Sequence, residues 1–108
     1  MNITVYCGAS LGNNEIYQQA TQKLGQWIAE KQHQLVYGGG ASGLMGLIAN
    51  SVLAQGGKVI GIIPEFLKER ELAHPNLTEL VIVESMTERK KRMFDLANAF
   101  IALPGGPG

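Results

Sequence analysis

Four consecutive cations at positions 89–92 are the side chains of this sequence most suited to bind an anion. They follow Ser85 and Glu88, whose spacing is typical of a capping box and predicts a helix that begins just after Ser85. Cations are mildly unfavourable at the electropositive N-terminus of a helix, so their concentration there indicates that an anion binds nearby. We expect Arg89 and Lys90 to contact this ligand, and the last two cations to form a solvated face.

Three glycine-rich segments, each directly after an apolar run, form the second group of candidate ligand-binding residues. They are Gly8–Gly12, Gly38–Gly43 and Pro104–Gly108. If the apolar runs are parallel strands, all three segments and the cationic helix start meet at the carboxyl edge of the sheet, where open α/β sheets bind ligands. Glycine-rich turns at this edge commonly cradle phosphate. The combination therefore predicts a small molecule that carries a phosphate.

The segment Gly38–Gly43 also satisfies the dinucleotide-binding pattern G-x-G-x-x-G between a strand and a helix. Two details disfavour a dinucleotide. The pattern follows the second predicted strand rather than the first, and the next strand ends at Pro64 without a carboxylate that would bind a ribose hydroxyl. Two interpretations remain open: glycines that permit a tight turn with close helix–sheet packing, or a phosphate or nucleotide site.

Alternating strand and helix patterns must position these residues. Apolar runs predict five strands, at residues 3–7, 34–37, 59–63, 80–83 and 100–103. Helical spacing predicts three helices, at residues 14–31, 44–53 and 85–98, and the second is apolar on most sides and therefore buried. Residues 65–79 are charged and irregular, with one short helical turn. We predict an α/β, Rossmann-like three-layer fold with a parallel sheet: a single nucleotide-binding domain over residues 1–108, truncated after the fifth strand.

Composition excludes several classes of function. The 108 residues are 45% hydrophobic and 17% charged, and nine basic side chains balance nine acidic ones, so no electrostatic surface for nucleic acid is expected. The chain does not start like a signal peptide, and no run approaches the ~18 apolar residues of a membrane span. We expect a soluble, cytoplasmic protein without a nucleic-acid or membrane partner.

The remaining reactive side chains carry weaker signals. His33 and His74 have no second ligand at metal-binding spacing, so we place both on the surface or in loops and expect no metal. Cys7 is the only cysteine, which excludes an intrachain disulfide, and we expect it at the edge of the core. Ser10 could donate to a phosphate, but no His/Asp pattern marks it as a nucleophile.

Four segments carry a family resemblance: "YGGGASGLMG", "VIGIIP", "MTERKKRM" and "AFIALPGGPG". They resemble the LONELY GUY family, the cytokinin riboside 5′-monophosphate phosphoribohydrolases, and the resemblance covers the chain from "VYCGAS" onward. The family's paired ERK…M and PGGxGTxxE motifs are specific. The second is present only as Pro104–Gly108: its threonine would be the next residue, and its functional glutamate would lie four beyond the end. Asn98 stands where the family usually has aspartate, a position that we interpret as packing or turn.

The resemblance implies hydrolysis of the N-glycosidic bond of cytokinin riboside 5′-monophosphates or AMP-like nucleotides, which releases the free base and ribose 5-phosphate without a cofactor. In family terms Arg89 is catalytic, and Glu71 and Lys90 contact the nucleoside monophosphate. The phosphate-holding turn corresponds to Gly105, Gly106 and Gly108. The resemblance also implies a homodimer. In such a reaction a carboxylate stabilises the oxocarbenium-like charge that develops on the sugar.

An alternative function is a non-catalytic nucleotide-binding or sensing module, or an inactive fragment. The discriminating feature is the family's motif glutamate, which the 108 residues lack. We therefore predict that the 108-residue chain alone is catalytically inactive. If it turned over substrate nevertheless, Glu71 would be the first carboxylate expected to take that role.

Overall fold

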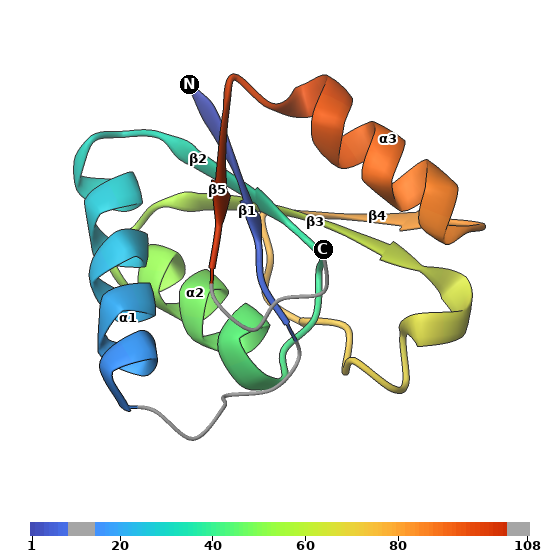
Figure 1. Cartoon of the computed structure of the whole chain (residues 1–108), viewed down its shortest axis with the longest axis horizontal. Coiled ribbons are helices and arrows are strands. Elements are labelled where there is room, and N and C mark those ends of the chain that lie inside the picture. Colours follow the sequence, from blue (N-terminus) through green and yellow to red (C-terminus); the bar gives the residue numbers. More distant parts are fainter. Residues whose placement is uncertain (9–14, 104–108) are drawn as a thin grey trace.

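The computed structural model describes residues 1–8 and 15–103. Five strands form one parallel sheet in the order β4-β3-β2-β1-β5 (Figure 1). They are β1 (Asn2–Tyr6), β2 (Gln34–Tyr37), β3 (Lys58–Pro64), β4 (Glu79–Val83) and β5 (Ala99–Ala102). The chain builds outward from β1 to β4 and then adds β5 on the other side of β1. Ligands of open α/β sheets bind outside the carboxyl ends of the strands, at such a change of direction.

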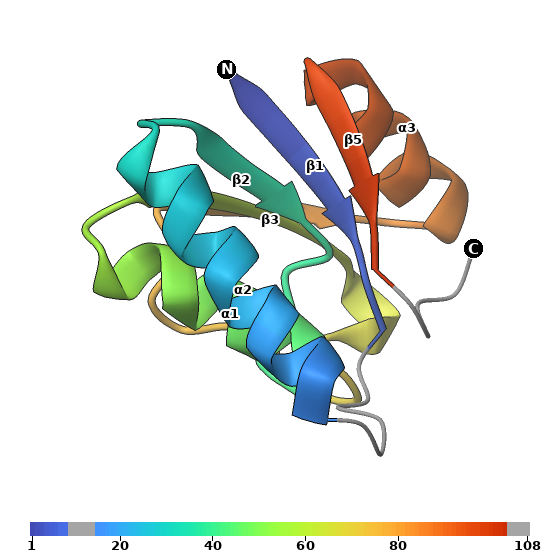
Figure 2. The same ribbon diagram turned by 60° about the vertical axis from the view of Figure 1, so that its left-hand side comes forward.

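Three helices cover the two faces of this sheet. They are α1 (Glu15–Glu30), α2 (Gly43–Ala54) and α3 (Met86–Leu96). Helices α1 and α2 pack side by side on one face, and α3 lies on the opposite face (Figure 2). This arrangement confirms the predicted α/β, Rossmann-like three-layer fold. Within the described ranges, no helix combines the length and apolar character that crossing a membrane requires.

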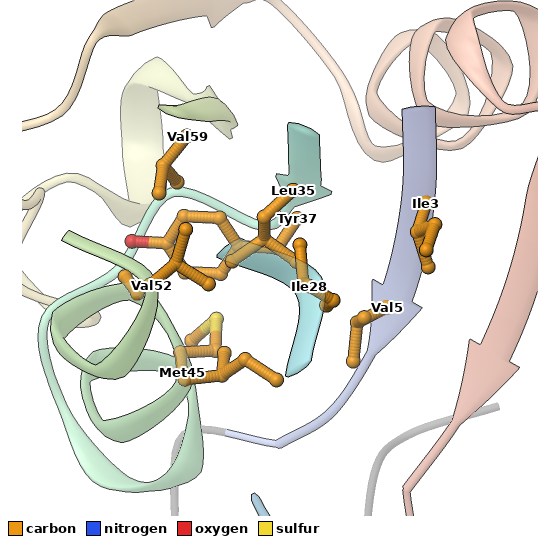
Figure 3. Packing of buried hydrophobic residues seen from close by; sticks show 10 residues of the cluster. Ile3, Val5, Ile28, Leu35, Tyr37, Met45, Val52 and Val59 are labelled. Carbon is orange, nitrogen blue, oxygen red and sulfur yellow. The ribbon is translucent and has the colours of Figure 1, made fainter. Parts of the chain in front are cut away.

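Apolar side chains fill both spaces between the sheet and the helices. Figure 3 shows Met45 and Val52 of α2 packed in one cluster with Leu35 and Tyr37 of β2. Successive strand residues point to opposite faces, so Val36 belongs to the other cluster. That cluster, under α3, contains Val36, Ile62, Val83 and Met93. The sequence of α2 predicts its burial, because it is apolar on most sides.

All elements except α3 end within one residue of the sequence prediction, and the ends of β3 and α3 have local reasons. Pro64 is extended (φ −66°, ψ 144°) and pairs with Val83, so β3 continues one residue further, as proline at a strand end allows. Helix α3 ends at Leu96 rather than at Asn98. The side-chain oxygen of Asn98 accepts the backbone N–H of Asn2 at 2.7 Å. The backbone N–H of Asn98 donates to the backbone carbonyl of Asn2 at 2.8 Å. These bonds confirm the interpretation of Asn98 as a packing and turn residue.

The connection from β3 to β4 carries two residues of the site. It contains one short turn of 3-10 helix, η1 (Glu65–Leu67), as the sequence predicted. The backbone that follows is irregular, carries Glu71 and His74, and forms an isolated antiparallel bridge between Ala73 and Gly40. This bridge attaches the connection to the turn after β2.

Candidate active site

A pocket of about 670 Å³ opens where β1 and β2 end and α3 begins. Its volume is typical of small-molecule sites. The lining residues are Val5, Tyr6, Cys7, Gly8, Gly38, Met45, Glu71, Met86, Arg89, Lys90, Lys91, Met93 and Phe94. The pocket thus lies at the carboxyl edge of the sheet, beside the strand at which the chain changes direction.

Arg89 projects from the first turns of α3 into the protein and forms a wall of the pocket. Ser85 caps this helix by accepting the N–H of Glu88 at 3.1 Å, as the capping-box spacing predicted. Arg89 is 7% exposed; its Nε donates to the Ile62 carbonyl at 2.9 Å, and its Nη2 donates to the Gly38 carbonyl. The guanidinium therefore joins the ends of β2 and β3, and these carbonyls compensate for its loss of water.

Glu71 supplies the acidic partner of the buried arginine. Its Oε1 lies 2.7 Å from Nη2 of Arg89, and the two side chains are 16% and 9% exposed. The basic stretch placed Arg89 at the ligand and the family resemblance placed Glu71 there, but neither predicted that the two residues pair. A buried charge without a partner is costly, so each side chain holds the other in place.

The backbone of the connection from β3 to β4 forms hydrogen bonds with the glycine-rich turn at residues 38–43. The N–H of Ala41 donates to the Leu72 carbonyl at 2.6 Å, and the N–H of His74 donates to the Gly39 carbonyl at 2.9 Å. The Ala41 N–H, a donor that a phosphate cradle would direct at an anion, is thereby used within the protein. Of the two interpretations left open by the sequence, these contacts favour tight packing.

The other cations of the basic stretch lie on the exposed side of α3. Lys90 and Lys91 are exposed and line the pocket, and Nζ of Lys91 also lies 3.8 Å from Oδ2 of Asp95. Arg92 is exposed and is not among the described pocket residues. Lys90 thus lies where a ligand contact is possible. The position of Lys91 differs from the prediction of a purely solvated residue, because Lys91 also lines the pocket.

The other two glycine-rich segments lie mostly outside the described residues. Gly8 is described and lines the pocket next to Cys7. The predicted contacts outside the described residues are Ser10, Gly105, Gly106 and Gly108. Their assignment to phosphate remains a prediction.

Sulfur-containing residues form a part of the site that sequence analysis did not assign to it. Cys7 packs against the edge of the core, as expected, but it also lines the pocket. Burial raises the pKa of its thiol to about 12, although Arg89 lowers this pKa to a smaller extent. The thiol is therefore protonated at neutral pH and a poor nucleophile. Met45 and Met86 place their sulfurs 4.0 and 3.9 Å from the Arg89 guanidinium. Both lie in segments that carry the family resemblance, but the sequence analysis gave neither of them a role.

His74 lies in a loop, one of the two positions predicted for it, and it is buried there, with only 6% exposed. Its Nε2 lies 2.7 Å from Oδ1 of Asn50, and its Nδ1 accepts the N–H of Asn76 at 3.1 Å. Burial lowers the pKa of this imidazole below its usual value. The loop folds onto α2, a tertiary contact with no local signal in the sequence. His33 is half-buried in the loop before β2.

The arrangement can bind an anionic ligand and stabilise a positive charge that develops within it. Nη1 of Arg89 lies 3.9 Å from the thioether of Met86, a weak acceptor that a ligand oxygen would replace. Lys90 adds a second cation at the mouth of the pocket, and Glu71 adds a carboxylate to its wall. A carboxylate in such a position can stabilise an oxocarbenium-like sugar.

Similarity to known proteins extends along the chain. The family model described as "Possible lysine decarboxylase" matches residues 45–108. The chain is 49% identical over 108 residues to the cytokinin riboside 5′-monophosphate phosphoribohydrolase of Rhodococcoides fascians, which covers 99% of this chain and 54% of that protein. It is 47% identical over 106 residues to the cytokinin riboside 5′-monophosphate phosphoribohydrolase LOG of Oryza sativa subsp. japonica, covering 98% and 44%. The chain spans about half the length of these relatives.

Solved structures with lower sequence identity share the fold. The Moco carrier protein from Chlamydomonas reinhardtii superposes with a TM-score of 0.81 at 21% identity, over 99% of this chain and 64% of that one. The molybdenum cofactor binding protein from Rippkaea orientalis gives a TM-score of 0.77 at 20% identity, over 99% and 63%. At these identities the likeness concerns the architecture alone.

Proposed function

This chain belongs to the LONELY GUY family, and on that premise we propose that the protein hydrolyses the N-glycosidic bond of a nucleoside 5′-monophosphate. The substrates are cytokinin riboside 5′-monophosphates or AMP-like nucleotides, and the products are the free base and ribose 5-phosphate. The relatives that are named for this activity support the substrate class.

The observation that carries the proposal is the buried pair of Arg89 and Glu71 in the pocket wall. Departure of the base builds positive charge on the ribose while water attacks C1′, and Glu71 stabilises that charge together with the family's motif glutamate, so that Glu71 alone does not suffice. Arg89 orients that carboxylate through Nη2 and offers Nη1 to a substrate oxygen. A planar guanidinium can make both contacts at once, whereas a lysine ammonium presents a single point charge.

The phosphate of the substrate needs its own donors. Lys90 lies at the mouth of the pocket and is the described cation that we assign to this role. The resemblance adds the turn that contains Gly105, Gly106 and Gly108. Strand β5 pairs with β1, so its carboxyl end lies at the same edge of the sheet as the pocket, and this placement of β5 supports the proposal.

We also infer a cytoplasmic homodimer, from the resemblance and the composition. Residues 1–108 alone are expected to bind nucleotide without turnover, because the family's motif glutamate is not among them. The relatives do not favour the alternative, a non-catalytic nucleotide-binding module. Base release by the full-length protein distinguishes the two, since a binding module would bind AMP and release no adenine.

The test is chromatographic measurement of adenine or cytokinin release by the full-length protein and its variants. Arg89→Ala is expected to lower kcat/KM by about 100-fold or more, the scale of losing a preorganised charged contact. Arg89→Lys is expected to be nearly as poor, because the carbonyls of Ile62 and Gly38 require a planar fork. Glu71→Gln keeps the size of the side chain and removes the stabilising charge.

Arg92→Ala is the matched control, because Arg92 is an exposed arginine of the same helix. It should retain wild-type turnover. Near-normal activity of Arg89→Ala or Glu71→Gln would contradict the proposal. Thermal unfolding of each variant separates loss of chemistry from loss of fold.

A further inference from the structure

Glu71 belongs to a segment whose conformation is not maintained by regular secondary structure. Leu72, the next residue, has a positive φ of 54° although it is not a glycine, a conformation that costs free energy and persists only where surrounding contacts impose it. The backbone of this segment bonds the turn after β2 through Ala41 and Leu72, at 2.6 Å, and through His74 and Gly39, at 2.9 Å. The position of the Glu71 carboxylate therefore depends on how firmly residues 71–76 are held.

The side chain of His74 is the contact between this segment and α2. Its Nδ1 accepts a backbone N–H, that of Asn76, at 3.1 Å, so this nitrogen must be unprotonated. Its Nε2 lies 2.7 Å from the side-chain Oδ1 of Asn50 and must donate to it. Both contacts are satisfied by one form of the ring only, the neutral imidazole with its proton on Nε2. Protonation of Nδ1 would set two donors against each other.

We propose that neutral His74 is a positioning residue, which fixes residues 71–76 to α2 and thereby holds Glu71 against Arg89, and that its protonation releases this carboxylate. The link to catalysis rests on the proposed function, whereas the attachment of the segment does not. His74 lies three residues from Glu71, and the bridge between Ala73 and Gly40 attaches the backbone between them to the turn after β2.

The surroundings of His74 favour its neutral form. Helix α2 and the turn at residues 38–42 pack against it and carry no charged side chain. On its own segment the nearest acid is Glu71, which pairs with Arg89. Burial is what lowers the pKa of the ring. A lowered pKa in the folded state means that the attachment is complete above pH 6.5, the unfolded value, and is lost as the pH falls through the folded pKa.

Nuclear magnetic resonance of the ¹⁵N-labelled full-length protein tests the attachment directly. At pH 7.5 the His74 ring should be neutral with its proton on Nε2. The amide of Ala41 should exchange about three- to tenfold faster in His74→Ala, since the attachment that protects its bond to Leu72 is lost. His74→Gln should retain most of this protection, because the side-chain amide nitrogen of glutamine takes the place of the ring Nε2 and can donate to Oδ1 of Asn50. It should also remove the pH dependence below pH 6.5.

Two results would overturn the proposal: a ring with its proton on Nδ1 at pH 7.5, or an Ala41 amide whose protection is the same in His74→Ala as in the wild type. If His74→Ala does not fold, the wild type decides, because its corrected Ala41 exchange must accelerate between pH 7 and pH 5 and that of His74→Gln must not. Base release is read separately. If exchange behaves as expected and the full-length protein releases no base, the attachment stands and the proposed function fails. If base is released and the exchange of the Ala41 amide is unchanged, the proposed function stands and the attachment fails.

Discussion

Two parts of the pocket carry charge but differ in how they are built. We call them the inner wall (Gly38, Glu71 and Arg89) and the rim (Lys90 and Lys91). At the wall, the arginine is 7% exposed and donates to three oxygen acceptors from separate parts of the chain. At the rim, both lysines are exposed, and the ion pair of Lys91 is a long contact, 3.8 Å, to Asp95 on its own helix. The same basic stretch of sequence supplies the arginine of the wall and the lysines of the rim.

This difference separates geometry from attraction. Charges at an exposed rim act through water and are screened by salt, so each contributes little and tolerates movement. Charges in the wall interact more strongly because the surrounding dielectric is lower. They require fixed positions, since a buried ion that loses its partner is strongly destabilising. We infer that the rim adjusts affinity for anions and that the wall determines where the chemistry occurs.

The largest effect is expected from Gly38→Ala, which breaks the wall without removing a charge. An added Cβ would collide with Nη2 of Arg89 and lie 3.1 Å from the Met45 sulfur, so the guanidinium must leave the Gly38 carbonyl. Misplacing a catalytic group by about 1 Å can cost about 100-fold in rate, and we expect kcat/KM for base release to fall by at least that factor. Overpacking should also lower the free energy of unfolding, by about 1–3 kcal/mol.

Gly56→Ala is the matched control for the Gly38 variant. Gly56 has a φ of +76°, and an added Cβ meets nothing within 4 Å, so the substitution strains the backbone without touching the pocket. It should lower the free energy of unfolding by about 1–3 kcal/mol and leave kcat/KM unchanged. Wild-type turnover in Gly38→Ala would show that the position of the guanidinium does not matter, and the comparison between wall and rim would fail.

A smaller, ligand-dependent effect is expected at the rim from Lys90→Ala. If Lys90 contacts the phosphate, AMP should bind about two- to fivefold more weakly, in line with ~0.2–1 kcal/mol for an exposed charge contact. Adenosine binding should not change. Calorimetry at low and high salt checks the cause, because screening should reduce the difference between the wild type and the variant. An equal loss of affinity for adenosine would instead place Lys90 at the nucleoside.

The sequence predicts the parts of the site that depend on local patterns. Ser85 and Glu88 mark the start of α3, and alternation of strands and helices places that start at the ligand-binding edge of the sheet. The pairing of Arg89 with Glu71 has no local signal, because it depends on the path of an irregular connection across the turn after β2. The burial of His74 escaped prediction for the same reason: polar loop residues are usually exposed, and this one is covered only because its loop folds onto α2.

The smallest effect of a substitution is expected at Lys91, a residue of the exposed rim. Its Nζ lies 3.8 Å from Oδ2 of Asp95, with the two side chains 76% and 57% exposed, so water and salt weaken the attraction. Lysine placed four residues before the acid is the less favourable orientation on a helix, and a cation near the start of α3 opposes the helix dipole. Alanine also has a higher helix propensity than lysine. Lys91→Ala should therefore change the free energy of unfolding by less than about 0.5 kcal/mol in urea titrations, and the change has no preferred sign. A loss above about 1 kcal/mol would mean that Lys91 belongs to a structural network like that of Arg89, and the division between wall and rim would have to be drawn elsewhere along α3.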